Sequence, residues 1–206
     1  MTDRALLRGR ELAVWRGAHC LFEQLHFELE TEQLALLVGP NGSGKTTLLR
    51  VLAGLALPTS GVVTWKGIAV HELAPEDRAD VAYRGHLEAL KRDLTVAENL
   101  RFHASLWGRA PNLDAILAEL KLEKAAHMRA RYLSAGQRRR VALAMLRLSD
   151  AKLWLLDEPT TNLDSEGRAL VVAWTRQHLA AGGMAVVATH QPDEFVTPGA
   201  LMIELQ

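Results

Sequence analysis

An eight-residue loop at 39–46, GPNGSGKT, constrains the fold of this chain more than any other feature of its sequence. The loop lies between an apolar run, LALLV, and a helical pattern, TTLLRVLAG, and it matches the spacing G-x-x-x-x-G-K-[ST]. We expect a buried strand, a tight turn and a helix in succession, because glycine permits turn conformations that other residues disfavour. Such a turn points backbone amides and a helix N-terminus at one place, which favours a bound polyphosphate.

The side chains of this loop suit a polyphosphate and its metal ion. Lys45 can reach the outer phosphates, and the hydroxyl of Thr46 can ligate magnesium. The predicted nucleotide-binding residues of the loop are Gly39, Pro40, Asn41, Gly42, Ser43, Gly44, Lys45, Thr46 and Thr47.

Two further apolar runs carry polar residues at their carboxyl ends. In LWLLDEPT the run ends at Asp157 and Glu158, and in MAVVATH it ends near His190. Ligands bind at the carboxyl edge of a parallel sheet, so these side chains are expected near Lys45. We expect Asp157 to hold magnesium directly or through water, Glu158 to orient or deprotonate an attacking water, and His190 to donate to a terminal phosphate.

The order of patterns along the chain predicts one α/β domain over 1–206. Strands are expected in LFEQLHFELE and LALLVG, with another after the turn at 58–61, so that a mixed sheet forms. From Thr95, where a capping box with Glu98 begins a helix, helical segments continue to about 149. We therefore divide the domain into a core, 1–94 and 150–206, and a helical subdomain, about 95–149, after which strand and helix lengths alternate again.

Composition excludes several classes of function. The 24 basic and 24 acidic side chains cancel, which argues against nucleic acid as the main partner. The single cysteine, Cys20, fits a reducing compartment and is expected to be a small buried hydrophobe. The N-terminus lacks the apolar segment of an export signal, and no apolar run approaches the roughly 20 residues of a membrane span. We expect a cytoplasmic protein that reaches a membrane only through a partner.

A second anion site is indicated at 133–140, LSAGQRRR. Ser134 and Gln137 have the spacing of a capping box, and small residues leave the amides of the helix start accessible. This site is part of a separate helical subdomain. A site that bound the phosphates at Lys45 of the same chain would not need such an insertion, so we expect it to bind the phosphates of another copy. Arg138, Arg139 and Arg140 are interpreted as solvated or salt-bridged helix positions without a catalytic role.

Five motifs in order resemble those of ABC-type ATPase domains over essentially the whole chain: GPNGSGKTT, LSAGQ, LLDEPT, NLD and ATH. The resemblance implies a P-loop NTPase of ABC type, with a mixed sheet core, an N-terminal antiparallel β subdomain and an inserted helical subdomain. It implies ATP and Mg²⁺ as ligands and head-to-tail packing of two nucleotide-binding domains. Because this chain has one set of motifs, it must pair with itself or with a separate homologue, and a homodimer is the simpler interpretation. By this resemblance the signature residues Ser134, Ala135, Gly136 and Gln137 lie against the nucleotide of the opposite subunit, Asp164 lies at the dimer seam, and Trp15 stacks on adenine.

The loop before the helical subdomain indicates which group of ABC ATPases the chain resembles. His86 stands where most ABC ATPases carry glutamine, and the pair GH, the following LK and LTVAENLRFHASLWG resemble the haem-exporter ATP-binding subunits of cytochrome c maturation, the CcmA family. That family often has glycine where Ala89 stands, and ABC proteins often have glycine at Ala135. The resemblance implies a role for His86 at the catalytic site, and Leu87, Ala89 and Leu90 are either contacts to a membrane subunit or core residues.

Under this interpretation the chain hydrolyses ATP for haem export, or for release of a haem-loaded chaperone, on the inner face of the bacterial membrane. Its partners are membrane subunits of the CcmB and CcmC type. Haem itself is not expected on this chain, because no C-x-x-C-H motif is present. Alternatives are an ABC ATPase for another substrate, a non-transport ABC protein acting on ribosomes or DNA, and a regulatory ATP-binding module.

Overall fold

The computed structural model describes residues 6–85, 89–108, 110–149 and 151–206. Contacts divide the chain into two compact units. The first contains Met1–Gly85, Ala151–Pro159 and Val172–Gln206, and the second contains His86–Asp150 and Thr160–Val171. Most contacts of each unit are made within that unit, so the two units are described separately.

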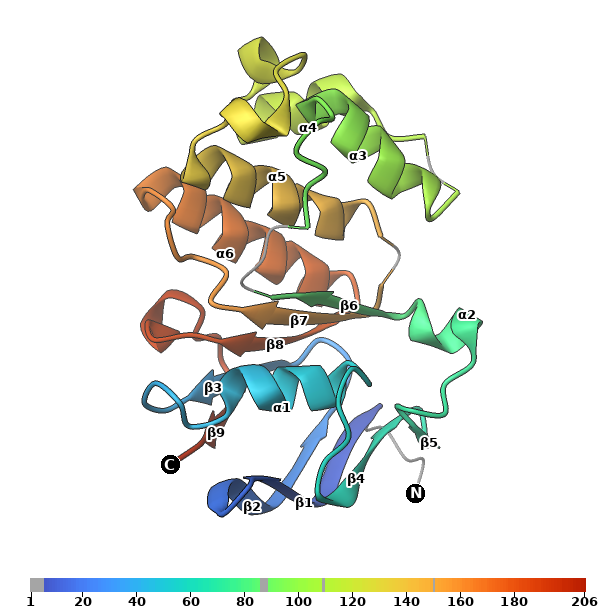
Figure 1. Ribbon diagram of the computed structural model, residues 1–206, viewed down its shortest axis with the longest axis vertical. Helices are drawn as coiled ribbons and strands as arrows, with labels where there is room; N and C mark the ends of the chain where they lie inside the picture. The colour runs from blue at the N-terminus through green and yellow to red at the C-terminus, as the bar shows by residue number, and fades with distance from the viewer. Residues whose placement is uncertain (1–5, 86–88, 109, 150) are drawn as a thin grey trace. The chain divides into compact units, whose positions relative to one another are not determined.

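The first unit contains a five-stranded parallel sheet, ordered β6-β7-β8-β3-β9 (Figure 1). Its three inner strands, β3, β7 and β8, are almost wholly apolar, as strands buried on both faces require. The strand bounds are β3 Leu34–Val38, β6 Val81–Arg84, β7 Leu153–Asp157, β8 Met184–Ala188 and β9 Leu201–Glu204. The predicted strands at 34–39 and 152–157 are confirmed.

A second, antiparallel sheet in the same unit has the order β2-β1-β4-β5. Its strands are β1 Leu7–Arg16, β2 His19–Leu29, β4 Ser60–Trp65 and β5 Ile68–Ala69. The expected mixture of parallel and antiparallel pairing is therefore present, divided between two sheets.

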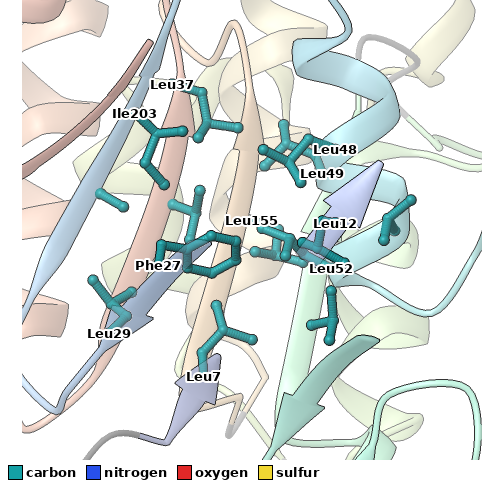
Figure 2. Packing of buried hydrophobic residues seen from close by; sticks show 14 of the residues in the cluster. Leu7, Leu12, Phe27, Leu29, Leu37, Leu48, Leu49, Leu52, Leu155 and Ile203 are labelled. Carbon is teal, nitrogen blue, oxygen red and sulfur yellow. The ribbon is translucent and has the colours of Figure 1, made fainter. Parts of the chain in front are cut away.

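Helix α1, Lys45–Leu52, packs into a core shared by the two sheets (Figure 2). Leu48, Leu49 and Leu52 of this helix meet Leu12 of β1 and Leu155 of β7, and all are buried. The periodicity of TTLLRVL places these leucines on one face, so burial of that face fixes where the preceding loop stands. A short helix, α2 Pro75–Arg78, and the 3₁₀ turn Pro192–Glu194 complete this unit.

The second unit is helical, with α3 Val96–Ser105, α4 Leu113–Leu120, α5 Ala135–Arg147 and two 3₁₀ turns, Glu123–Ala125 and Ala130–Tyr132. A fully buried Asn99 joins α3 to the segment before it, because its side chain bonds both the amide and the carbonyl of Lys91 and the carbonyls of Leu94 and Thr95. The long helix α6, Ser165–Ala180, begins in this unit and ends in the first.

Candidate active site

The loop between β3 and α1 takes the backbone path that its glycines allow. Gly39 has φ 144°, and a Cβ there would stand 2.1 Å from the carbonyl oxygen of Leu205. Gly44, at φ 99°, is the N-cap of α1 and has no side chain to cap the helix. The first-turn amides of α1 are therefore not bonded to a capping side chain and can bind an anion.

Lys45 and Ser43 are buried within this loop. The Lys45 ammonium, in a residue that is 8% exposed, donates to the carbonyl oxygens of Gly39 at 2.7 Å and Pro40 at 2.9 Å. The Ser43 hydroxyl is buried with no hydrogen-bond partner among the described residues. A buried hydroxyl without a partner costs about 1–3 kcal/mol, so a ligand oxygen that bonds to it would be favoured.

Strand β7 brings two carboxylates to the same place. Asp157 is its last residue, 4% exposed, and accepts a hydrogen bond from the Thr46 hydroxyl at 2.9 Å. Glu158 follows with φ 48°, in the left-handed region, while its amide donates to Ala188 of β8 at 2.9 Å. Such a conformation is unfavourable for glutamate, and the bond of its amide to β8 helps to hold it.

His190 lies next to Glu158, with 3.3 Å between its Nε2 and the Oε1 of the glutamate. Strand β8 ends at Ala188, so the parallel register of β7 and β8 brings the two side chains together, as the sequence predicts. A carboxylate and an imidazole at this distance can share or pass a proton.

These groups line one cavity of about 310 Å³ in the first unit. Its lining consists of Arg16, Leu21, Asn41, Gly42, Gly44, Lys45, Thr46, Thr47, Asp157, Glu158 and His190. Most of the predicted loop residues and all three of Asp157, Glu158 and His190 thus meet in one place. Arg16 was missed by the sequence analysis, and the only available signal was its position directly after Trp15.

Trp15 does not line this cavity. Its side chain is 44% exposed, and its amide donates to the hydroxyl of Thr59 at 3.0 Å. The strand end is thereby fixed, and an exposed indole remains beside a residue, Arg16, that does line the cavity. Stacking of Trp15 on adenine stays a prediction.

The second unit has a cavity of its own, of about 420 Å³, at the start of α5. It is lined by Lys121, Leu122, Ser134, Gly136, Gln137, Arg140, Asn162, Leu163 and Asp164. The predicted capping box is confirmed, because the Gln137 amide donates to the Ser134 hydroxyl at 3.2 Å and the Ser134 amide donates to the Gln137 side chain at 2.9 Å. Ala135, the first residue of α5, is exposed and does not line this cavity.

The three arginines after the capping box have different surroundings. Arg140 makes two bonds to the Asp164 carboxylate, at 2.6 and 2.7 Å. The Gly167 amide and Arg140 together hold the pKa of Asp164 below its ordinary value. Arg138 donates to the Leu133 carbonyl at 2.6 Å, and Arg139 is 5% exposed. Of the two expected environments, solvated or salt-bridged, the salt-bridged one is present at Arg140, and Arg139 is not solvated.

The predicted catalytic residue His86 lies outside the described residues, as does Leu87. Ala89 is exposed and has φ 51°, a conformation that glycine adopts more readily, and Leu90 is half-buried. In the part of the chain that the structure describes, no helix has the length and apolar character needed to cross a bilayer.

Comparison with known proteins agrees with this geometry. Residues 22–161 match the family described as ABC transporter. The chain is 48% identical over 200 residues to the cytochrome c biogenesis ATP-binding export protein CcmA of Paracoccus denitrificans, covering 97% of this chain and 89% of the relative. It is 46% identical over 190 residues to CcmA 2 of Cupriavidus metallidurans, covering 91% of this chain and 90% of the relative.

Solved structures share the fold at lower identity. An ATP-binding subunit of an ABC transporter superposes with a TM-score of 0.85 at 23% identity, over 98% of this chain and 86% of the other. A dimeric ATP-binding cassette in a post-hydrolysis state, bound to ADP and Pi, superposes with a TM-score of 0.81 at 22% identity, over 97% of this chain and 94% of the other. The predicted ABC fold is confirmed. With the family match over 22–161 and relatives of nearly equal length, the chain belongs to the ABC transporter family, among the cytochrome c biogenesis ATP-binding export proteins CcmA.

Proposed function

We propose that this chain is the ATP-hydrolysing subunit of a membrane ABC complex that handles haem during cytochrome c maturation. One observation carries the hydrolytic part: a phosphate loop, two carboxylates and a histidine meet in a single cavity. The names of the relatives, cytochrome c biogenesis ATP-binding export proteins, support the haem part. Hydrolysis would drive haem export or release of a haem-loaded chaperone.

The loop is suited to hold the phosphates of ATP. The first-turn amides of α1, the helix dipole and the Lys45 ammonium supply positive potential at one end of the cavity. Lys45 uses two of its three donors on the carbonyls of Gly39 and Pro40, so it is already oriented before a phosphate arrives. The unpartnered Ser43 hydroxyl adds a further donor.

Magnesium fits the pair formed by Thr46 and Asp157. Mg²⁺ prefers oxygen ligands and usually takes only one or two from protein, the others being water and phosphate oxygens. The Thr46 hydroxyl and the Asp157 carboxylate lie 2.9 Å apart and provide such a pair. When bound there, Mg²⁺ would neutralise charge that develops on the phosphates.

Glu158 is proposed as the group that orients the attacking water and accepts its proton. Its carboxylate lines the cavity and lies 3.3 Å from His190 Nε2, which keeps it directed toward the site. His190 is half-exposed in its side chain and can donate to a terminal phosphate. Neither role requires a residue from the second unit.

The signature residues are proposed to bind the nucleotide of a second copy. Ser134, Gly136 and Gln137 line a cavity in the second unit, where the start of α5 offers amides and a hydroxyl to an anion. A related fold has been solved as a dimer with ADP and Pi. We therefore propose a head-to-tail homodimer with Asp164 at its seam.

The complex is proposed to lie on the inner face of the bacterial membrane, with this chain on the cytoplasmic side and membrane subunits of the CcmB and CcmC type as partners. Ala89 and Leu90 are candidate contacts to such a subunit. Co-purification tests this part of the proposal: recovery with a CcmB-type protein is expected, and recovery instead with a permease for another solute would contradict it.

The hydrolytic assignment is tested with Glu158→Gln. The amide keeps the size of the side chain and cannot accept the proton, so we expect ATP hydrolysis to fall by about 100-fold or more while ATP still binds. Lys45→Ala is the matched variant on the phosphate side, and it should lose ATP binding itself. Hydrolysis by Glu158→Gln at the wild-type rate would refute Glu158 as the base.

A further inference from the structure

Arg16 stands at a fixed point beside the phosphate loop. It is the last residue of β1 and pairs with His19 across the turn to β2. The preceding residue is anchored, because the Trp15 amide donates to the Thr59 hydroxyl while the Thr59 amide donates to the Ala13 carbonyl at 2.8 Å. The start of the Arg16 side chain is therefore held by the sheet.

The other end of Arg16 reaches the first turn of α1. Its Nη2 donates to the hydroxyl of Thr47 at 3.1 Å, although the two residues are 31 positions apart in the sequence. Thr47 is the third residue of α1, and the amides of that turn are the ones that attract a phosphate. The guanidinium thus lies next to the place where the loop would hold its anion.

The other charged groups of the cavity suggest that the Arg16 guanidinium binds phosphate. Asp157 and Glu158 supply two carboxylates, and Lys45 is engaged with two loop carbonyls. Among the described residues, Arg16 uses one of its five N–H donors in the bond to Thr47. Arg16 is exposed and lines the cavity. A planar guanidinium with unused donors is well suited to bind phosphate oxygens.

We propose that Arg16 is a second phosphate-binding cation of this site, which positions the polyphosphate of the nucleotide against the first turn of α1. The proposal rests on the nucleotide site described above. Thr47 serves as the resting partner of the guanidinium, and its hydroxyl keeps the side chain turned into the cavity before a nucleotide binds. Arg16 thereby acts mainly on affinity, since its hydrogen bond within the described residues goes to Thr47, on the phosphate side of the cavity, whereas Glu158 and His190 are paired with each other.

Binding of Mg-ATP and of Mg-tripolyphosphate, which has no base or sugar, tests the proposal. Arg16→Ala should weaken the binding of both ligands by about 10- to 100-fold, the range for a lost charge-assisted hydrogen bond. Arg16→Lys should recover part of the loss, since it restores the charge without the fork. In hydrolysis, Arg16→Ala should raise the KM for ATP by a similar factor while kcat changes by less than about threefold.

Arg10→Ala is the matched control, because Arg10 is an exposed arginine on the same strand and does not line this cavity. It should bind both ligands as the wild type does. The proposal is overturned if Arg16→Ala binds both ligands with wild-type affinity, or if it loses ATP affinity and keeps that for tripolyphosphate. Failure of the underlying site is separate: it would appear as unchanged ATP binding in Lys45→Ala.

Discussion

At the scale of single residues, a half-buried histidine, His178, packs at the amino-terminal ends of β7 and β8, away from the nucleotide cavity at their carboxyl ends. The His178 ring stacks on Trp154 at 4.0 Å between centroids, with 7° between the planes. Its Nε2 lies 3.1 Å from the Met184 carbonyl and 3.2 Å from the Lys152 carbonyl. A Cβ on Gly183 would stand 2.3 Å from that nitrogen, so the histidine fits only because residue 183 has no side chain.

This contact makes stability depend on pH. Burial lowers the pKa of His178, and the bonds to Met184 and Lys152 offset only part of that effect. In the unfolded chain the imidazole protonates near pH 6.5, whereas the folded protein takes up the proton only at lower pH. Below about pH 6.5 the unfolded state therefore binds more protons than the folded state. The contribution of His178 to the free energy of unfolding is fully present above about pH 6.5, and it decreases as the pH falls below that value.

The melting temperature at about pH 8 and about pH 5.5 measures the contribution. His178→Gln should lower the melting temperature at the higher pH and reduce its fall on acidification. His127→Gln alters an exposed histidine and should leave the wild-type pH dependence in place. Equal losses on acidification in wild type and His178→Gln would show that this ring is not the titrating group.

At the scale of elements, two helices of the second unit begin with the same cap. Ser134 and Gln137 start α5, while Thr95 and Glu98 start α3, and each pair makes the reciprocal bonds of a capping box. Replacing either hydroxyl residue by alanine should lower the free energy of unfolding by about 1 kcal/mol. The two variants are therefore matched in their effect on helix stability.

Only one of the two caps lies at a proposed phosphate site. Ser134→Ala should lower ATP hydrolysis by about tenfold or more, because it removes a donor to the nucleotide in addition to a cap. Thr95→Ala should hydrolyse ATP at close to the wild-type rate. Denaturant unfolding and steady-state hydrolysis, measured on both variants, check this. An equal fall in hydrolysis would mean that Ser134 serves only the helix.

The elements that were predicted from sequence have strong local signals. The strand at 34–38, the glycine loop and the strand ending at Asp157 follow from apolar runs bounded by glycine or charge. Strand β6, Val81–Arg84, has no such signal, since its residues are all only half-buried at the sheet edge. It was not predicted because it pairs with β7, whose partner residues lie 72 positions further along the chain, as in Val81 with Leu153, and no local pattern encodes such a contact.

The same reason explains which site residues were found. Lys45, Thr46 and Asp157 belong to contiguous motifs whose chemistry is legible from spacing. The bonds from Arg16 to Thr47, 31 residues apart, and from Arg140 to Asp164, 24 residues apart, depend on how separate elements pack. The division of the sheet into a parallel and an antiparallel part likewise depends on the core around α1, which no single segment determines.

At the scale of the whole molecule, a complete ATP site is proposed to need Lys45 from one chain and Ser134 from another. These residues line two separate cavities, one in each unit. Lys45→Ala removes the phosphate side of the chain's contribution, and Ser134→Arg fills the signature side with a bulky cation. Neither variant alone can build a complete site in a homodimer, so each should hydrolyse ATP at a small fraction of the wild-type rate.

A mixture of the two variants distinguishes a shared site from one within a single chain. In a head-to-tail heterodimer the Ser134→Arg chain supplies an intact phosphate loop and the Lys45→Ala chain supplies an intact signature, so one complete site forms. An equal mixture would then regain roughly a quarter of the wild-type rate if the two sites act independently, since half of the dimers are mixed and each has one working site. If each chain instead completed its own site, mixing would restore nothing at any ratio. Hydrolysis measured against mixing ratio, with Glu158→Gln added to the Ser134→Arg chain as the control that removes the recovered activity, separates the two arrangements.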